Sequence, residues 1–222
     1  MPNSPLQTTQ LIEHSKRWDD SAISRAIETA ELKTSGEIVP VISRSLDRYQ
    51  EVELLLILAS LTICSLGLTL FHWLNHWDPS INLILSAQTL SAGLGWILGK
   101  LPAVQRLILG KERLRDLTHR TACQLFLELG LTETRDRTGV LILIAEKEHH
   151  VEIIADHGIH SRVPEDYWKN EVQLITQGIR MGRPTEALCE VIEQIGSKLA
   201  ENFPKRADDS NELPNTPVHR GL

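Results

Sequence analysis

The sequence predicts an α/β domain, a small mixed sheet flanked by helices, that is interrupted by a two-helix transmembrane hairpin. Three observations predict this fold class. Short β-branched runs alternate with patterns of helical period, two uncharged blocks follow the first of these runs, and the soluble pattern resumes after them. We therefore expect one split cytosolic domain built from residues 9–51 and 111–203, with the hairpin over 52–98.

The first segment of the split domain contains one helix and one strand. Apolar residues at helical spacing over 22–30 predict a helix that residues 19–21 can cap. GEIVPVIS, residues 36–43, then predicts a strand, in which Pro40 favours an edge or a bulge because it cannot donate to a ladder. Residues 1–8 are predicted to be a disordered N-terminus.

The predicted hairpin consists of two uncharged spans. The first, 54–71, has 18 residues without a charge, close to the length that crosses a hydrocarbon core at 1.5 Å per residue. The second, 81–98, is also uncharged but contains more polar residues. Small residues recur there every fourth position and should pack against the first span: Ala87, Ser91, Gly95 and Gly99.

The distribution of basic residues predicts the orientation of the hairpin. The connection 75–80 contains no Lys or Arg, whereas both flanks contain several. The positive-inside bias then places both flanks and both termini in the cytoplasm. We expect a multi-pass protein of the inner (cytoplasmic) membrane. An even number of spans is also required, because one span would leave the two halves of the domain in different compartments.

Residues 99–110 are predicted to be a juxtamembrane interfacial segment. Leu101, Val104 and Leu107 lie at helical spacing, with basic residues between and after them. This pattern suits a helix that lies along anionic headgroups of the lipid bilayer. The alternative, that these are the first turns of a soluble helix, stays open.

The second segment of the domain contains the remaining elements. A helix is predicted over 111–129 and should end at Gly130. GVLILIA, residues 139–145, is a continuous apolar run typical of a central strand covered on both faces. Residues 151–155 follow a polar turn, so these two strands should pair as a hairpin.

Two further helices and a tail complete the chain. One helix should begin at Pro164 or Glu165, and another at Pro184, which suits the first helical position. Residues 204–222 contain three prolines among polar residues and are predicted to be a disordered tail.

Composition excludes some functions. The net charge of −6 gives no attraction to phosphate backbones, so we expect no nucleic-acid partner. Cys64, Cys123 and Cys189 form no CxxC pair, and the simplest interpretation is buried free thiols in a reducing compartment. No serine nucleophile elbow, no HExxH zinc motif and no Cys/His pairing is identified.

In this order of elements, the chain resembles the TPM domain family over about 21–203. The matching pieces are TSGEIV at 34–39, LGLT at 129–132, the TR…RTGVLI stretch within 134–142, and 151–159. The resemblance is closest to the bacterial branch of uncharacterised membrane proteins, in which a hairpin interrupts the domain.

The resemblance implies fold and membrane setting more than chemistry. Some members of the family are associated with acid phosphatase activity or photosystem maintenance, and calcium has been linked to the fold; others are membrane-associated modules. We expect a membrane-anchored, non-catalytic binding or assembly and maintenance module for membrane-protein partners. The alternative is a divalent-metal-dependent, phosphatase-like hydrolase, and whether the chain is an enzyme stays open.

Three carboxylates are candidate ligands of a divalent cation. Asp136 precedes one strand of the predicted β-hairpin and Asp156 ends the other, so both should lie at one edge of the sheet, and Glu37 starts the first strand. The alternative is that neighbouring Arg135 and Arg137 pair with these acids, or that the acids cap turns. No catalytic or cofactor-binding residue is assigned, and no cofactor other than this cation is expected.

Overall fold

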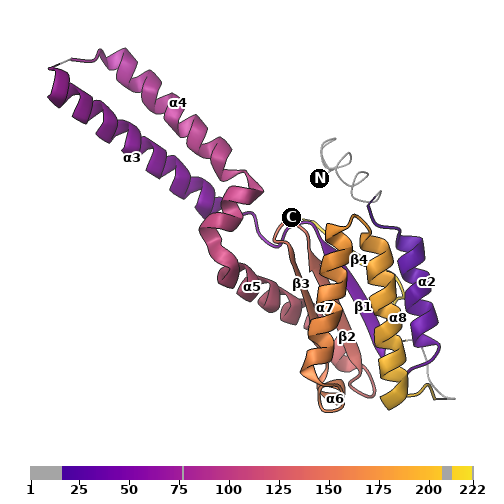
Figure 1. The fold of residues 1–222 in the computed structure, drawn as a ribbon. Helices are drawn as coiled ribbons and strands as arrows, with labels where there is room; N and C mark the ends of the chain where they lie inside the picture. Colours follow the sequence, from indigo (N-terminus) through magenta and orange to yellow (C-terminus); the bar gives the residue numbers. More distant parts are fainter. Residues whose placement is uncertain (1–16, 77, 207–211, 222) are drawn as a thin grey trace, which may run out of the picture. The chain divides into compact units, whose positions relative to one another are not determined.

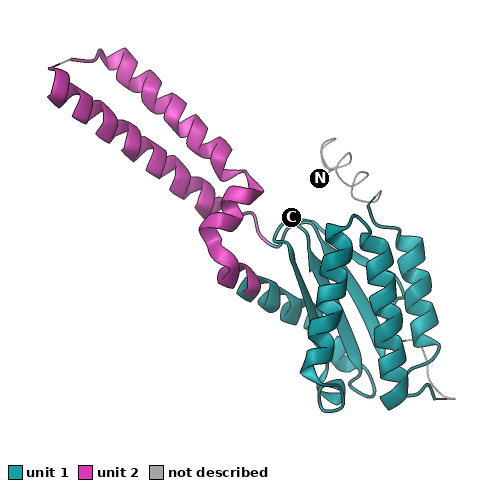
Figure 2. Cartoon of the chain, viewed as in Figure 1, with its two compact units in different colours: residues 1–46, 116–222 teal, residues 47–115 magenta. Residues whose placement is uncertain are grey.

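The computed structural model describes residues 17–76, 78–206 and 212–221. The predicted disordered N-terminus, 1–8, lies outside these ranges. The chain divides into two compact units, one of residues 1–46 with 116–222 and the other of residues 47–115 (Figure 2). The first unit thus joins two chain segments. Next to the hairpin these segments end at residue 46 and resume at residue 116, each about five residues from the expected limits of 51 and 111.

The first unit contains a four-stranded mixed sheet in the order β3-β2-β1-β4 (Figure 1). β1 pairs in parallel with both β2 and β4, and β2 pairs with β3 in antiparallel fashion. The predicted β-hairpin and the predicted fold class are therefore confirmed. The strands are β1 (Glu37–Ser43), β2 (Gly139–Ala145), β3 (His150–Ala155) and β4 (Val218–Arg220).

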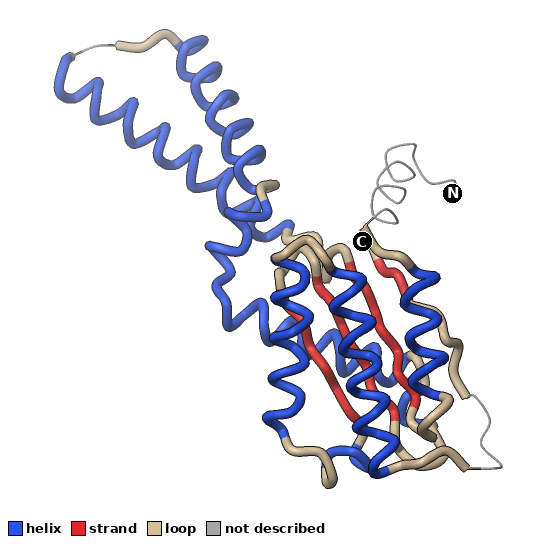
Figure 3. Tube along the Cα trace, turned by 45° about the vertical axis from the view of Figure 1, so that its right-hand side comes forward, coloured by secondary structure: helices blue, strands red, loops and turns tan. Residues whose placement is uncertain are grey.

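Apolar cores lie on both faces of the sheet, which helices enclose (Figure 3). Every residue of β2 is buried, and alternate residues point to opposite faces. Val140 and Ile142 join the core under α2 (Asp20–Glu31), α7 (Glu165–Arg180) and α8 (Pro184–Asn202). Leu141 and Leu143 join the core formed with Ala122, Leu125 and Phe126 of α5 (Pro102–Glu128). The prediction of a central strand covered on both faces is confirmed.

The predicted helix ends also appear in the structure. The Asp19 side chain accepts a hydrogen bond from the backbone N of Ala22 at 3.1 Å and so caps α2. Gly130 follows α5 with φ of 73°, a left-handed conformation that glycine adopts without steric cost. Pro184 begins α8. Local chemistry thus determines where these helices begin and end.

The C-terminal segment departs from the expectation. Val218–Arg220, within the predicted disordered tail 204–222, forms β4 beside residues 41–43 of β1. The pairing is non-local: the backbone N of Arg44 donates to the carbonyl of Arg220 at 2.9 Å. The parallel pairing with β4 begins at Val41, one residue after Pro40, so among the described residues β1 is an edge on this side at the proline, which has no N–H to donate.

The second unit contains α3 (Gln50–Asn75) and α4 (Ile81–Gly99), which pack against each other. The contact runs through the small residues of α4. A Cβ atom added at Gly95 would lie 2.7 Å from the carbonyl oxygen of Leu56, and one added at Gly99 would lie 2.7 Å from the Cα of Glu53. Gln88 Nε2 also donates to Ser65 Oγ across the pair at 3.3 Å. Close approach at Gly95 and Gly99 is confirmed.

Both helices are long and apolar enough to cross a membrane, with mean hydropathies of 2.4 and 1.4 over 18-residue windows. Of these windows, 0% and 6% respectively is buried. The buried residues of α4 are its two packed glycines. The large apolar side chains of the pair therefore face outwards.

α5 is interrupted at Gly110, whose φ of 74° and ψ of 162° are not helical. The helical turns before this point begin at Pro102, and the Gln105 amide donates to the carbonyl of Gly99 at 2.7 Å. The break coincides with the predicted boundary between the segment 99–110 and the domain segment 111–203.

Candidate functional site

The predicted carboxylates lie at one end of the sheet. Glu37 starts β1, Asp136 precedes β2, and Asp156 follows the antiparallel strand β3. The backbone N of Asp156 donates to the carbonyl of Gly139 at 2.9 Å, which fixes the end of β3 beside the start of β2. The topology thus places the three residues at the edge expected.

All three carboxylates have basic or backbone partners, and Glu37 Oε1 accepts from the backbone N of Glu212 at 3.2 Å. Asp136 Oδ1 accepts from Arg206 Nη2 at 3.0 Å. Asp156 Oδ1 accepts from the backbone N of His157 at 2.6 Å and caps the short helix α6 (His157–His160). Its Oδ2 lies 3.8 Å from Arg137 Nε. The structure therefore shows the alternative interpretation for Asp156, an acid that caps a turn and pairs with Arg137.

Glu37 lies in a different cavity from Asp136. The cavity of Glu37 has about 350 Å³ and includes Glu31, whereas that of Asp136 has about 370 Å³ and includes Arg162 and Arg206. Across the described part of the chain, no group of three His, Cys, Asp or Glu side chains is arranged to hold a metal ion. Cation binding by the three predicted residues stays a prediction, without a preformed ligand cluster.

Glu31 is a buried acid at this end of the sheet with a strongly raised pKa. Its side chain is 8% exposed, and its Oε1 accepts from the backbone N of Ile38 at 3.1 Å. Burial, followed by the nearby charge of Glu37, raises the pKa of Glu31 to about 8. Glu31 is therefore mostly neutral at pH 7, which makes it a poor cation ligand.

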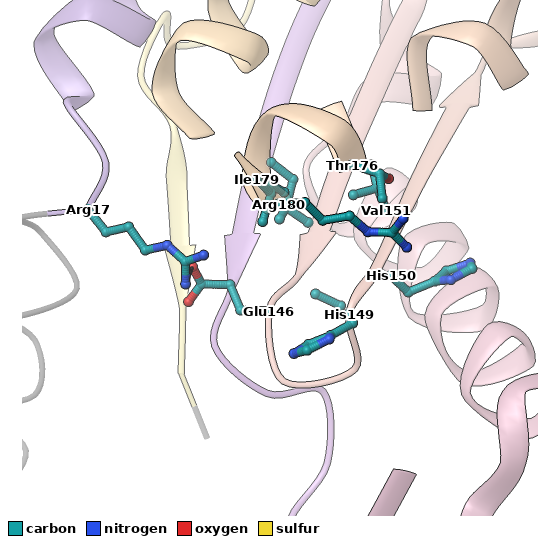
Figure 4. Close-up of a pocket in the computed structure, with 10 residues that line it drawn as sticks. Arg17, Glu146, His149, His150, Val151, Thr176, Ile179 and Arg180 are labelled. Carbon is teal, nitrogen blue, oxygen red and sulfur yellow. Dashed lines mark ion pairs between the residues drawn. The ribbon is translucent and has the colours of Figure 1, made fainter. Parts of the chain in front are cut away.

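A cavity of about 250 Å³ lies at the opposite end of the sheet, beside the carboxyl end of β2 and the last turns of α7 (Figure 4). Ligands of open α/β sheets bind preferentially at the carboxyl ends of strands. The residues that line this cavity, the β2–α7 pocket, are Arg17, Ile144, Ala145, Glu146, His149, His150, Val151, Thr176, Ile179 and Arg180.

Basic groups predominate over acidic ones in the β2–α7 pocket. Glu146 Oε1 accepts from Trp18 Nε1 at 3.0 Å and lies 3.4 Å from Arg17 Nη1; Figure 4 shows Arg17 and Glu146 facing each other. Arg180 extends from α7 and makes no ion pair with any residue that the structure describes. Among the described residues of the lining, Glu146 is the one acid and is already paired, so the pocket suits an acidic group of a ligand.

A row of polar side chains from α5 and β3 forms a second constellation, which we call the His–Glu–Cys row. Cys123 Sγ lies 3.7 Å from His119 Nε2, and His119 Nδ1 lies 2.9 Å from Glu152 Oε1. Glu152 Oε2 lies 3.6 Å from His150 Nε2. Cys123 is exposed, which corrects the expectation that all three thiols are buried; Cys64 and Cys189 are intermediate.

The sequence analysis did not identify this row. Its only local signal is the spacing of four between His119 and Cys123 on a predicted helix, which places both on one face. Glu152 reaches them only because α5 packs on the sheet face from which Glu152 projects.

The comparisons with known proteins agree with this fold. Residues 105–198 match the model of the TPM domain. No curated protein matches the chain in sequence. The NMR structure of BA42 protein from the psychrophilic bacterium Bizionia argentinensis is similar, with a TM-score of 0.55 and 21% identity over 92% of this chain and 93% of that chain. This identity is low enough that the likeness shows the fold alone. The resemblance to the TPM domain family is therefore confirmed, and residues 105–198 are the part of the chain that carries the family match.

Proposed function

We propose that this chain is a TPM-domain protein anchored in the cytoplasmic membrane by α3 and α4, and that its domain binds membrane-protein partners as an assembly or maintenance module. The observation that carries the proposal is the outward-facing apolar surface of α3 and α4, of whose windows 0% and 6% is buried.

Elementary energetics supports insertion of the helix pair in lipid. A core helix of a soluble domain buries its apolar side chains, whereas Ile63, Leu66 and Leu90 are 70%, 64% and 77% exposed. Apolar surface in water is unfavourable by about 25 cal/mol per Å², and monomeric soluble proteins rarely expose large contiguous apolar patches. Lipid removes this penalty without any further protein contact.

The fold of the domain supports an even number of spans. β1 and β2 are parallel neighbours over their full lengths, although α3 and α4 lie between them in sequence. Both ends of the helix pair must therefore emerge on the same side of the membrane. The connection 75–80 contains no Lys or Arg, so the proposed side for the domain is the cytoplasm.

The β2–α7 pocket is the proposed binding site for a partner. Its basic side chains, Arg180 above all, would recognise an acidic side chain on a cytoplasmic segment of a membrane protein. Binding rather than turnover is proposed, because the hydroxyl of Thr176, the one hydroxyl among the described lining residues, donates to the backbone carbonyl of Val172 at 2.7 Å and not to a base.

The test of anchoring compares two equally exposed leucines. Leu66 of α3 and Leu127 of α5 are 64% and 65% exposed. An arginine at the centre of a span disfavours insertion by roughly 3 kcal/mol, so Leu66→Arg should move the full-length chain from the carbonate-resistant membrane fraction to the soluble or aggregated fraction. Leu127→Arg should leave it in the membrane. If both variants stay in the membrane, α3 does not span it.

The test of binding compares two arginines near the end of α7. A photo-crosslinker at Thr176, inside the β2–α7 pocket, should capture a membrane protein in native membranes, and Arg180→Glu should abolish the product. Arg183 pairs with Glu186 outside the pocket, so Arg183→Glu should leave the product unchanged. Equal loss in both variants would argue against the pocket as the binding site.

A further inference from the structure

The His–Glu–Cys row places a thiol, an imidazole and a carboxylate in line on the surface of the domain. The three groups come from two elements, α5 and β3, and lie within one compact unit. The distances are 3.7 Å from Cys123 Sγ to His119 Nε2 and 2.9 Å from His119 Nδ1 to Glu152 Oε1. A nucleophile beside a base that a third group orients is the arrangement that activates side chains for covalent chemistry.

The contact with Glu152 determines which nitrogen of His119 faces the thiol as an acceptor. An ionised carboxylate only accepts hydrogen bonds, so His119 Nδ1 must donate its proton to Glu152 Oε1. In the neutral imidazole the other nitrogen, Nε2, then carries the lone pair. This lone pair is directed at the side of the ring where Cys123 Sγ lies.

Glu152 is held in the charged form that this role needs. Burial alone would raise the pKa of Glu152, but hydrogen bonds from His150 and His119 more than offset burial, and its pKa lies below the ordinary value. An imidazolium on His119, formed when it takes a proton from the thiol, would be stabilised by this carboxylate.

The geometry points to Cys123 as a nucleophilic thiol that exchanges with small-molecule disulfides. Nε2 of His119 takes the S–H proton, and the thiolate sulfur of Cys123 attacks one sulfur of the disulfide. The S–S bond of the reagent breaks, a mixed disulfide forms at Cys123, and the leaving thiolate carries away the electron pair. The imidazolium of His119 returns the proton to that leaving thiolate, so one thiol is consumed and one is released.

Cys189 provides an internal comparison. It lies in α8 and is half-buried, and burial followed by the charges of Glu193 and Asp19 raises the pKa of its thiol. A thiol in such surroundings resists exchange because the thiolate is the reacting form. The two cysteines of the domain should therefore differ strongly in rate.

The experiment measures disulfide exchange by Cys123 alone. In the full chain in detergent, Cys64→Ser and Cys189→Ser leave one thiol, and 4,4′-dithiodipyridine reports each exchange by release of thiopyridone. His119→Gln should slow the reaction at neutral pH on the order of 10-fold, because it removes the base. Glu152→Gln should slow it by roughly 3-fold, because it removes only the group that orients the base.

Two controls separate activation from exposure. In the matched background that retains only Cys189, His119→Gln should not change the rate. In concentrated urea the effect of His119→Gln on the rate at Cys123 should vanish, because the row is disassembled. An unchanged rate at Cys123 in folded His119→Gln, verified by circular dichroism, would overturn the proposal and leave exposure as the cause of reactivity. If His119→Gln unfolds the domain, Glu152→Gln is used in its place, and an unchanged rate at Cys123 in that folded variant would overturn the proposal.

Discussion

The two units of the molecule place the same residue types in opposite positions. In the domain, Leu141 and Ile142 are 0% exposed and lie between helices on both faces of the sheet. In the helix pair α3 and α4, many leucines and isoleucines are exposed, and the helices approach closely at Gly95 and Gly99. The leucines and isoleucines of the sheet are inside the domain, whereas those on the outer faces of the helix pair are exposed.

In the proposed membrane setting, close packing and not burial from water holds α3 against α4. Burial from water drives the assembly of the domain. Between helices in lipid that driving force is absent, and small residues that let backbones approach closely replace it. A substitution should therefore act through removed volume in the domain and through added volume in the helix pair.

The largest expected effect is truncation of a leucine in the domain. Leu141→Ala leaves a cavity in a fully buried strand and should lower the free energy of unfolding of the domain by about 3 kcal/mol. Leu66→Ala removes the same atoms from an exposed face of α3. It should change the free energy of unfolding of the domain by less than about 0.5 kcal/mol. Pulse proteolysis of the full chain in increasing urea measures both. Equal losses would remove the contrast between the units.

Next in size is the addition of volume to α4. A side chain at Gly95 would meet the carbonyl of Leu56 and the hydroxyl of Ser60, at 2.7 and 2.6 Å from its Cβ, so Gly95→Leu should weaken packing of the pair by about 2 kcal/mol. Gly93 has no atom within 4 Å of an added Cβ, so Gly93→Leu is the matched control. The yield of a disulfide between cysteines placed at Ser65 and Gln88, without the native cysteines, should fall only in the Gly95 variant.

A smaller effect concerns the acid that the domain buries. The pKa of Glu31 is about 8 in the folded chain against an ordinary 4.5, so the folded state holds a proton that the unfolded state loses. The contribution of Glu31 to the free energy of unfolding is fully present below pH 4.5. It is lost progressively as the pH rises from 4.5 through about 8. Glu31→Gln should flatten this decline and raise stability by about 1–2 kcal/mol at pH 8, with little change near pH 4.5.

Urea denaturation at the two pH values measures this difference. Glu133→Gln, at an exposed acid whose charge is not among those that act on Glu31, is the control, because it removes a carboxylate without a buried proton. A gain from Glu31→Gln that is the same at both pH values would show that its proton is not linked to folding.

Elements with a strong local pattern could be predicted from the sequence. In three places the local residue types alone predict the structure that forms. These are the apolar run from Gly139 to Ala145, the proline that starts α8 and the glycine that ends α5. The same holds for the small-residue spacing that brings Gly95 and Gly99 against α3.

Features that depend on a distant partner could not be predicted. β4 has only three residues, and β1 supplies its pairing from the other end of the chain. Asp136 and Asp156 reach the expected edge, and the pairing of Arg137 with Asp156 was among the alternatives, but Arg206, which pairs with Asp136, comes from the distant C-terminal segment. The His–Glu–Cys row likewise needs Glu152 to project from a strand onto a helix 33 residues earlier in the chain.

The parallel pairing of β1 with β2 has a consequence for biosynthesis. When β1 leaves the ribosome its partner strand is still untranslated, and residues 44–138 must be synthesised first. At typical rates of 5–20 residues per second this interval lasts roughly 5–20 s. During that time β1 has both edges unpaired, so under the proposed anchoring the apolar helices insert first and the sheet closes second. A chain delayed at the first step would present an aggregation-prone strand to the solvent.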